Sequence, residues 1–173
     1  MKGVLVVPIG NVGADILQAI VSALIKTFSV SVETCAGMDI PQNSYSAKRR
    51  QYHSAIVLKE LQDFRKREVV VLGVTDADLY VPELNFVFGE ADVRSGVAAI
   101  SLARLRQEFY ELHADERLLK ERAAKEAVHE IGHAFGLDHC SDPKCIMFFS
   151  NGIEDTDGKG PGFCGLCKNL LGI

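Results

Sequence analysis

One short string of residues constrains this chain more than any other feature. Residues 129–139 read His-Glu-Ile-Gly-His-Ala-Phe-Gly-Leu-Asp-His. Histidines four positions apart lie on one face of an α-helix, so the imidazoles of His129 and His133 can reach the same metal ion. Glu130 projects about 100° further around the helix, where its carboxylate can hold a water against that ion. The string therefore predicts a helix that carries a metal site and its base.

The end of the string predicts a third ligand. Gly136 suits a helix end, because glycine readily takes the left-handed conformation that turns the chain. That turn can bring His139 back toward the other two histidines. Three protein ligands leave one position of zinc open, which is the mark of a catalytic site. The alternative, a solvated helix end with incidental histidines, is disfavoured, since only about one random chain in ~10^5 would contain all five fixed residues.

Four cysteines downstream predict a second metal site. Cys140 and Cys145 form one pair, and after eighteen residues Cys164 and Cys167 form another. Two closely spaced pairs separated by a loop fit a tetrahedral, closed zinc site with a structural role. Such a site would attach the C-terminal tail to the histidine helix. Adjacent side chains point opposite ways in extended chain, so one strand could place His139 and Cys140 at different zinc ions.

Two other uses of the cysteines remain open. Two disulfides are disfavoured, because the N-terminus shows no secretion signal and thiols stay reduced in the cytosol. A thioredoxin-like redox role for Cys164 and Cys167 is weaker still, since the pair does not open the helix of a βαβ unit. Zinc is the interpretation that fits the spacing best.

These residues together resemble the archaemetzincins, a family in the metzincin clan of zinc-dependent metalloproteases. The resemblance rests on the histidine string, on the four cysteines and on residues 145–151, Cys-Ile-Met-Phe-Phe-Ser-Asn, which are similar to the family's C-x-M-x-F-S-N stretch. The motifs cover roughly residues 129–167, and the N-terminal part agrees only in length and element order.

The resemblance implies a role for each motif residue. The catalytic zinc ligands would be His129, His133 and His139, and the general base would be Glu130. The four cysteines would hold a second, structural zinc, so two Zn²⁺ ions are expected per chain. Met147 would be the methionine of the Met-turn, a bend beneath the metal site where a flexible thioether packs under the imidazoles.

The rest of the chain alternates between strand-like and helical patterns. We expect strands at Gly3–Pro8, Val30–Cys35, Glu68–Val74, Asn85–Gly89 and Val97–Leu102, and helices at Ala14–Phe28, Ser44–Lys66 and Asp115–Phe135. This order predicts an α/β fold of the metzincin type, with a twisted, mostly parallel sheet and packed helices. We expect an N-terminal α/β subdomain over residues 1–136, which includes the active-site helix. Residues 137–173 would form a small C-terminal subdomain with the third histidine, the Met-turn and the cysteine site.

Two segments bear on substrate binding. Asn85–Gly89 is short and follows Pro82, which suits a strand at the sheet edge. In the metzincin clan such an edge receives the substrate as an added strand, and pairing through the main chain would accept many peptides. A plain structural edge is equally consistent with the pattern. Phe148 and Phe149 are expected in the core, although one of them could also border a pocket for a substrate side chain.

Composition excludes several classes of protein. The 173 residues carry a net charge of −4, which gives no reason to expect nucleic acid as a partner. No apolar run is long enough to span a bilayer, and the run Val4–Val7 is too short for a signal peptide. We therefore expect a cytoplasmic protein, without membrane contact and monomeric. The basic stretches 48–50 and 65–67 are expected on a solvated helix face.

Five remaining residues have simpler explanations than catalysis. Cys35 lies outside both cysteine pairs and is expected to be a buried, inert thiol. His53 and His113 lack partners at ligand spacing, so surface positions are expected. Asp76 and Asp78 follow a strand, where ligands often bind in α/β sheets, but turn chemistry explains them nearly as well.

The predicted activity is that of a zinc metallopeptidase acting on a peptide or protein substrate. A water on the three-histidine zinc would attack the peptide bond, with Glu130 as general base. Residues 148–173 contain no tyrosine, so oxyanion stabilisation would rest on zinc and backbone amides, and modest activity is expected. The alternative is a catalytically silent peptide-binding protein that retains the metal architecture. A zinc-ribbon module for nucleic acid would use only the cysteines and is disfavoured by the acidic charge.

Overall fold

A five-stranded sheet forms the centre of the computed structural model, which describes residues 3–173. Its strands, in spatial order, are β2 (Ser31–Thr34), β1 (Gly3–Ile9), β5 (Val69–Thr75), β8 (Val97–Ser101) and β7 (Gly89–Asp92). The first four strands are parallel, and β7 pairs antiparallel with β8 at the edge. The predicted fold class, a mostly parallel sheet with packed helices, is confirmed.

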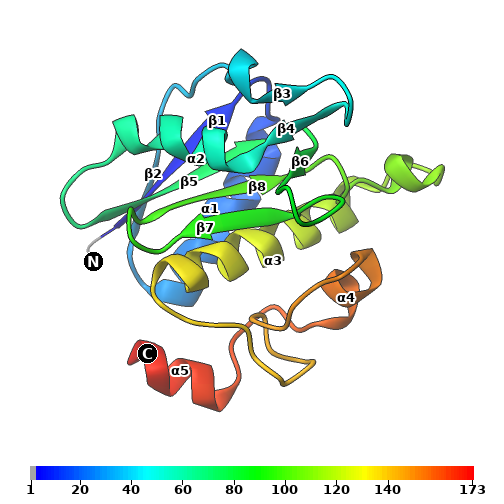
Figure 1. The fold of residues 1–173 in the computed structure, drawn as a ribbon. Coiled ribbons are helices and arrows are strands. Elements are labelled where there is room, and N and C mark those ends of the chain that lie inside the picture. The colour runs from blue at the N-terminus through cyan, green and yellow to red at the C-terminus, as the bar shows by residue number, and fades with distance from the viewer. Residues whose placement is uncertain (1–2) are drawn as a thin grey trace.

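Helices cover both faces of this sheet (Figure 1), and they are α1 (Ala14–Phe28), α2 (Ser54–Leu61) and α3 (Glu116–Ala134). Side chains alternate along β1, so Val4 and Val6 pack on the α1 and α3 side, while Leu5 and Val7 pack on the α2 side. Burial on both faces explains why the central strands are continuous apolar runs. None of the helices formed by residues 3–173 is long and apolar enough to cross a membrane.

Helix α3 carries the histidine string, and its two ends follow the sequence signals. The Asp115 side chain accepts a hydrogen bond from the Leu118 N–H at 2.9 Å, an N-cap that satisfies one of the free amides of the first turn. At the other end Gly136 has φ of 96°, and its N–H donates to the His133 carbonyl at 2.8 Å. Only glycine takes this conformation without strain. The predicted helix over Asp115–Phe135 is confirmed to within a residue.

The helix predicted over Ser44–Lys66 is wrong in its first half. This segment contains η1 (Gln42–Ser44), β3 (Tyr45–Ser46), β4 (Gln51–His53), α2 and η2 (Gln62–Phe64), and a three-stranded sheet joins β3 and β4 to β6 (Leu79–Tyr80). Arg50 has φ of 57°, which turns β3 into β4. The Gln51 amide is buried and donates to Asp78 and to the Asn85 carbonyl. These tertiary contacts outweigh local helix propensity.

The predicted edge strand is displaced along the chain. Pairing with β8 begins only at Gly89, so the strand is Gly89–Asp92 rather than Asn85–Gly89. In the preceding segment Val87 forms an isolated bridge to Leu79, and the rings of Phe86 and Phe88 pack against each other at 5.0 Å. Their aromatic packing, rather than a ladder, explains the apolar pattern there.

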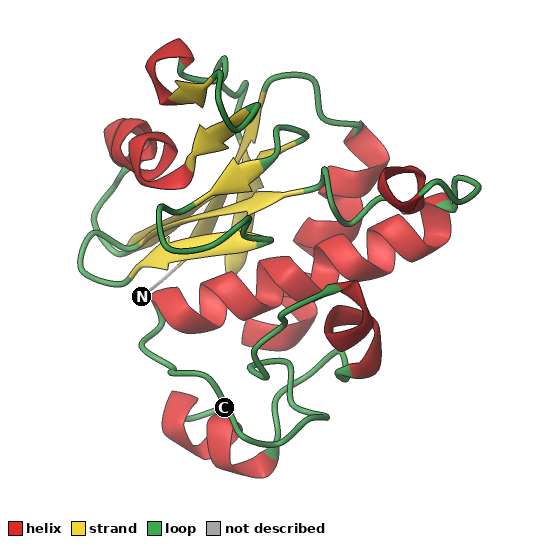
Figure 2. Cartoon of the chain, turned by 45° about the vertical axis from the view of Figure 1, so that its right-hand side comes forward, coloured by secondary structure: helices red, strands yellow, loops and turns green. Residues whose placement is uncertain are grey.

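The C-terminal segment packs on the face of α3 that points away from the sheet (Figures 1 and 2). It contains two short helices that the sequence patterns did not predict, α4 (Ile153–Gly158) and α5 (Gly165–Leu171). Leu137, Ile146 and Phe163 belong to the same apolar cluster as α1 and α3. The ring of Phe28 on α1 contacts Phe163 edge-on, with centroids 5.5 Å apart. Helix α3 is therefore buried between the sheet and this segment.

The two basic stretches lie outside the helices, residues 48–50 in a turn and residues 65–67 in the irregular segment before β5, so their placement on a helix face is wrong. Arg49 donates to the carbonyls of Pro82 and Leu84, and its guanidinium lies 4.4 Å from the centre of the Tyr80 ring. This arginine therefore helps to hold the segment before β7 in place.

Candidate metal centre and cleft

Three imidazoles converge at the end of α3. The Nε2 atom of His133 lies 3.1 Å from Nε2 of His129 and 3.2 Å from Nε2 of His139. Nδ1 of His129 donates to the Ile146 carbonyl at 2.8 Å, and Nδ1 of His133 donates to the Leu137 carbonyl at 2.7 Å. Because a carbonyl only accepts, these bonds place the proton on Nδ1 and leave the Nε2 lone pair free.

The geometry of these nitrogens fits a metal ion. The Nε2 lone pairs of His129 and His133 face each other with no proton between them, an arrangement that a shared cation would stabilise. Zn–N bonds of about 2.0–2.1 Å in a tetrahedral arrangement place nitrogens about 3.3–3.4 Å apart, close to the separations found. Burial lowers the pKa of His129 well below its ordinary value, and burial also lowers the pKa values of His133 and His139. The rings are thus held in the neutral form that binds metal.

The Glu130 carboxylate lies beside this group, between α3 and the edge strand. The residue is 5% exposed. Burial, with the negative charge of Glu126 as a second cause, raises the pKa of Glu130 well above its ordinary value. A Cβ atom placed on Gly89 would lie 2.6 Å from both Cγ and Oε1 of Glu130. The glycine therefore creates the space that this carboxylate occupies.

The four cysteines form a second, separate group. The Sγ atoms of Cys140 and Cys164 are 3.8 Å apart, and those of Cys145 and Cys167 are 3.7 Å apart. Zn–S bonds of about 2.3 Å give tetrahedral sulfur separations of about 3.8 Å, whereas a disulfide requires about 2.05 Å. The four thiols are free, which excludes the two-disulfide interpretation for this structure. The backbone N–H of Cys167 lowers the pKa of the Cys164 thiol to about 7 and so favours the thiolate.

Met147 lies beneath the histidine helix. It is fully buried, and a Cβ atom on Gly132 would lie 2.5 Å from its Sδ atom. Gly132 stands between the two helical histidines, so the thioether packs directly under that turn of α3. The Met147 carbonyl accepts from the Cys140 N–H at 2.9 Å, which links this bend to the start of the cysteine group.

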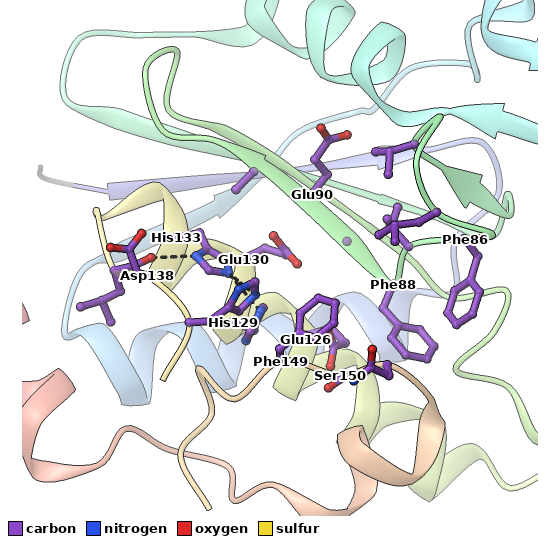
Figure 3. A pocket seen from close by; sticks show the side chains of 18 of the residues that line it. Phe86, Phe88, Glu90, Glu126, His129, Glu130, His133, Asp138, Phe149 and Ser150 are labelled. Carbon is purple, nitrogen blue, oxygen red and sulfur yellow. Dashed lines mark hydrogen bonds between the residues drawn. The ribbon is translucent and has the colours of Figure 1, made fainter. Parts of the chain in front are cut away.

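A cleft of about 640 Å³ opens over the three histidines and Glu130. One wall is the edge strand β7, and another is formed by residues 149–151 after the Met147 bend. Figure 3 shows Phe86 and Phe88 on the far side of the cleft from Asp138. Phe149 is 40% exposed and its ring contacts His139 edge-on at 4.8 Å, so its predicted core position is wrong.

The two aspartates after β5 form separate ion pairs. Asp78 accepts two hydrogen bonds from Arg104, at 2.8 and 2.9 Å, and Asp76 pairs with Arg106. The Arg104 guanidinium lies 4.3 Å from the ring centre of Phe86. This pair therefore supports the aromatic wall of the cleft from behind.

The other singled-out residues lie away from both groups. Cys35 is half-buried rather than buried, and its thiol is free. His53 is also half-buried, with its ring stacked on Tyr80 at a centroid distance of 5.2 Å, so its predicted surface position is only partly correct. His113 is exposed, as predicted.

Comparison with known proteins gives a consistent class. The model of peptidase family M54 matches residues 15–172. The archaemetzincin of Pyrococcus furiosus is 44% identical over 175 residues, which cover 97% of this chain and 91% of the relative. The archaemetzincin of Methanocaldococcus jannaschii is 44% identical over 164 residues, which cover 95% of this chain and 89% of the relative.

Solved structures agree with this result. The crystal structure of a zinc-dependent peptidase from Methanocorpusculum labreanum matches with a TM-score of 0.91 and 33% identity, over 98% of this chain and all of that one (100%). The archaemetzincin of Archaeoglobus fulgidus, complexed with malonate, matches with a TM-score of 0.84 and 38% identity, over 97% and 99% of the two chains. Fold and site thus define a metallopeptidase. More particularly, the chain belongs to the archaemetzincins, peptidase family M54.

Proposed function

We propose that this metallopeptidase hydrolyses peptide bonds at a three-histidine zinc, with Glu130 as general base. The observation that carries the proposal is the buried Glu130 carboxylate beside three imidazoles whose Nε2 atoms converge within one cleft. A peptide-binding scaffold has no evident need for such a carboxylate.

Each residue of the site has a defined task in this proposal. His129, His133 and His139 would hold the metal, and the carbonyls behind the first two fix their ring orientation. Zinc bound there would supply Lewis-acid activation of water and of the scissile carbonyl. Glu130 would take a proton from the attacking water and transfer it to the leaving nitrogen. The free edge of β7 offers backbone groups with which an extended substrate can pair.

We further propose a second zinc at Cys140, Cys145, Cys164 and Cys167, giving two zinc ions per chain. The sulfur separations given above support this proposal. Residues 137–173 would then act as a small subdomain that the cysteine zinc stabilises and that contributes His139 and Met147 to the site. The substrate would be a peptide or protein, and the chain would act as a monomer.

The test combines metal content with turnover. The purified chain is reconstituted with zinc, desalted and measured by elemental mass spectrometry, and it is then incubated with an unstructured peptide library. A value near two zinc ions per chain together with cleaved peptides supports the proposal. Near one zinc and no cleavage would favour the rival, a silent peptide-binding protein, and peptide binding without cleavage would establish it.

A substitution at Gly89 tests the position of the base. Gly89→Ala is expected to reduce kcat/KM about 100-fold, because the new Cβ displaces the Glu130 carboxylate and misplacement by about 1 Å costs roughly that factor. Zinc content and thermal stability should stay near those of the parent, since alanine suits a strand better than glycine does. Gly158→Ala is the matched control, because a Cβ there meets nothing within 4 Å. Unchanged activity in Gly89→Ala would contradict the proposed position of Glu130.

A further inference from the structure

A buried ion pair lies at the inner end of the cleft, and the proposed chemistry does not use it. Glu126 is one helical turn before Glu130, and its side chain is only 3% exposed although it lines the cleft. Lys159 is fully buried, and its Nζ atom lies 2.9 Å from Oε1 of Glu126. The Thr156 hydroxyl donates to the same oxygen at 3.1 Å. Glu126 and Lys159 thus form an ion pair in which the two formal charges offset each other.

Two polar atoms at this end of the cleft have unused bonding capacity. Both partners of Glu126 contact Oε1, and no group of residues 3–173 bonds to its Oε2 atom. The Ser150 hydroxyl is buried and has no hydrogen-bond partner within the same range. Both residues line the cleft. Of these two atoms the Ser150 hydroxyl is the buried one, and a buried polar group without a partner is costly, so a ligand that hydrogen-bonds to it gains more than it would at a solvated site.

Aromatic rings border the approach to these two atoms. Figure 3 shows Phe149, Glu126 and Ser150 together beside the histidines, with Phe88 beyond them. All four residues line the same cleft. Phe149 also contacts the ring of His139, so this region adjoins the proposed site of bond cleavage. It suits a side chain of the residue next to the scissile bond.

We propose that these four residues form a subsite for a substrate side chain with an apolar body and a hydrogen-bond donor at its tip. This inference rests on the proposed peptidase function. The body packs between Phe88 and Phe149, and the tip donates to Oε2 of Glu126 while bonding to Ser150. A tyrosine phenol fits these demands without adding charge to the neutral pair. A lysine ammonium is the other donor of this shape, but it brings a second cation toward Lys159.

Acidic and purely apolar side chains are disfavoured at this subsite. A glutamate tip would face the Glu126 carboxylate, and the cleft lining formed by residues 3–173 includes no lysine or arginine that could compensate. A phenylalanine would cover Oε2 of Glu126 without bonding to it, and it would leave the buried Ser150 hydroxyl without a partner.

The experiment uses the zinc-loaded protein and one peptide that it cleaves. After mass spectrometry locates the scissile bond, each of the two flanking residues is replaced in turn by tyrosine, lysine, phenylalanine or glutamate. We expect one flanking position at which tyrosine exceeds phenylalanine at least about tenfold in kcat/KM, with glutamate lowest. A kcat/KM of the lysine peptide between those of the phenylalanine and tyrosine peptides also supports a hydrogen-bond donor at the tip. A kcat/KM of the lysine peptide above that of the tyrosine peptide would assign the tip to an ammonium group. Equal rates for tyrosine and phenylalanine at both positions, or a preference for glutamate, would overturn the inference.

Variants of the subsite residues distinguish a specific hydrogen-bonding role from a general packing role. Ser150→Ala and the double variant Glu126→Gln with Lys159→Met should each bring the tyrosine-to-phenylalanine ratio toward one. The double change is needed because Glu126→Gln alone leaves a buried ammonium without a counter-charge. Ser22→Ala, an exposed serine on α1, is the matched control and should keep the parent ratio.

A binding measurement distinguishes failure of this inference from failure of the proposed function. In the Glu130→Gln background, fluorescence anisotropy compares the Kd values of the tyrosine and phenylalanine peptides without turnover. Tighter binding of the tyrosine peptide supports the subsite even if the wild-type chain hydrolyses nothing. Cleavage of all peptides at one rate, with equal Kd values, would refute the subsite and leave the peptidase function standing.

Discussion

Glu130→Gln is expected to lose nearly all peptidase activity while keeping its zinc. General acid–base catalysis contributes roughly 10²–10⁴-fold to rate, and glutamine cannot accept the proton although it has almost the same shape. Glu130 does not belong to the group of three histidines that could hold the metal, so the zinc content of the variant should match that of the parent. The measurement is kcat on a fluorogenic peptide, with zinc determined on the same sample.

The control for this variant is Glu121→Gln on the same helix. Glu121 is exposed and pairs with Arg117 one turn away, and such pairs contribute little. Its activity should match that of the parent. If Glu130→Gln still cleaves peptides at a comparable rate, Glu130 is not the base. If it loses zinc as well as activity, the carboxylate has a metal-binding role that the proposed mechanism does not include.

The grouping of the candidate metal ligands could be predicted from sequence because their geometry is local. A four-residue spacing on a helix places His129 and His133 on one face whatever the rest of the chain does. Gly136 marks the turn that returns His139, and its φ of 96° matches that expectation. The cysteine pairs are short-range signals of the same kind. The structure brings both groups together, with the ligand atoms of each within 4.8 Å of one another.

The residues that surround the metal site could not be predicted in this way, because their contacts join distant parts of the chain. Gly89 is an ordinary glycine in the sequence, and its role appears only when β7 lies against Glu130. Lys159 follows a polar stretch that is typical of a loop, yet it is fully buried beside Glu126. The spacing of Glu126 and Glu130, one helical turn apart, was a signal that could have indicated a shared environment.

Packing of the C-terminal segment on α3 explains why the site depends on it. Arg122 makes two hydrogen bonds to Asp157, at 2.7 and 2.6 Å, and Lys125 donates to the Asp157 carbonyl at 3.1 Å. These contacts hold α4 against α3. The part of the segment that carries His139 and Met147 would, by contrast, be stabilised by the proposed cysteine zinc. Loss of that metal should therefore affect the catalytic centre as well as the tail.

Cys167→Ser is expected to remove the cysteine zinc and, with it, most of the activity. A structural zinc ion contributes about 10–16 kcal/mol in isolated zinc-finger peptides, which is comparable to the roughly 5–15 kcal/mol stability of a whole domain. Cys167 is 4% exposed, so the serine hydroxyl would also be buried in an apolar cluster. Zinc per chain should fall by at least one and the melting temperature should drop. Cys35→Ser, outside both groups, should match the parent, whereas parent-like zinc content and stability in Cys167→Ser would exclude a structural metal at the four cysteines.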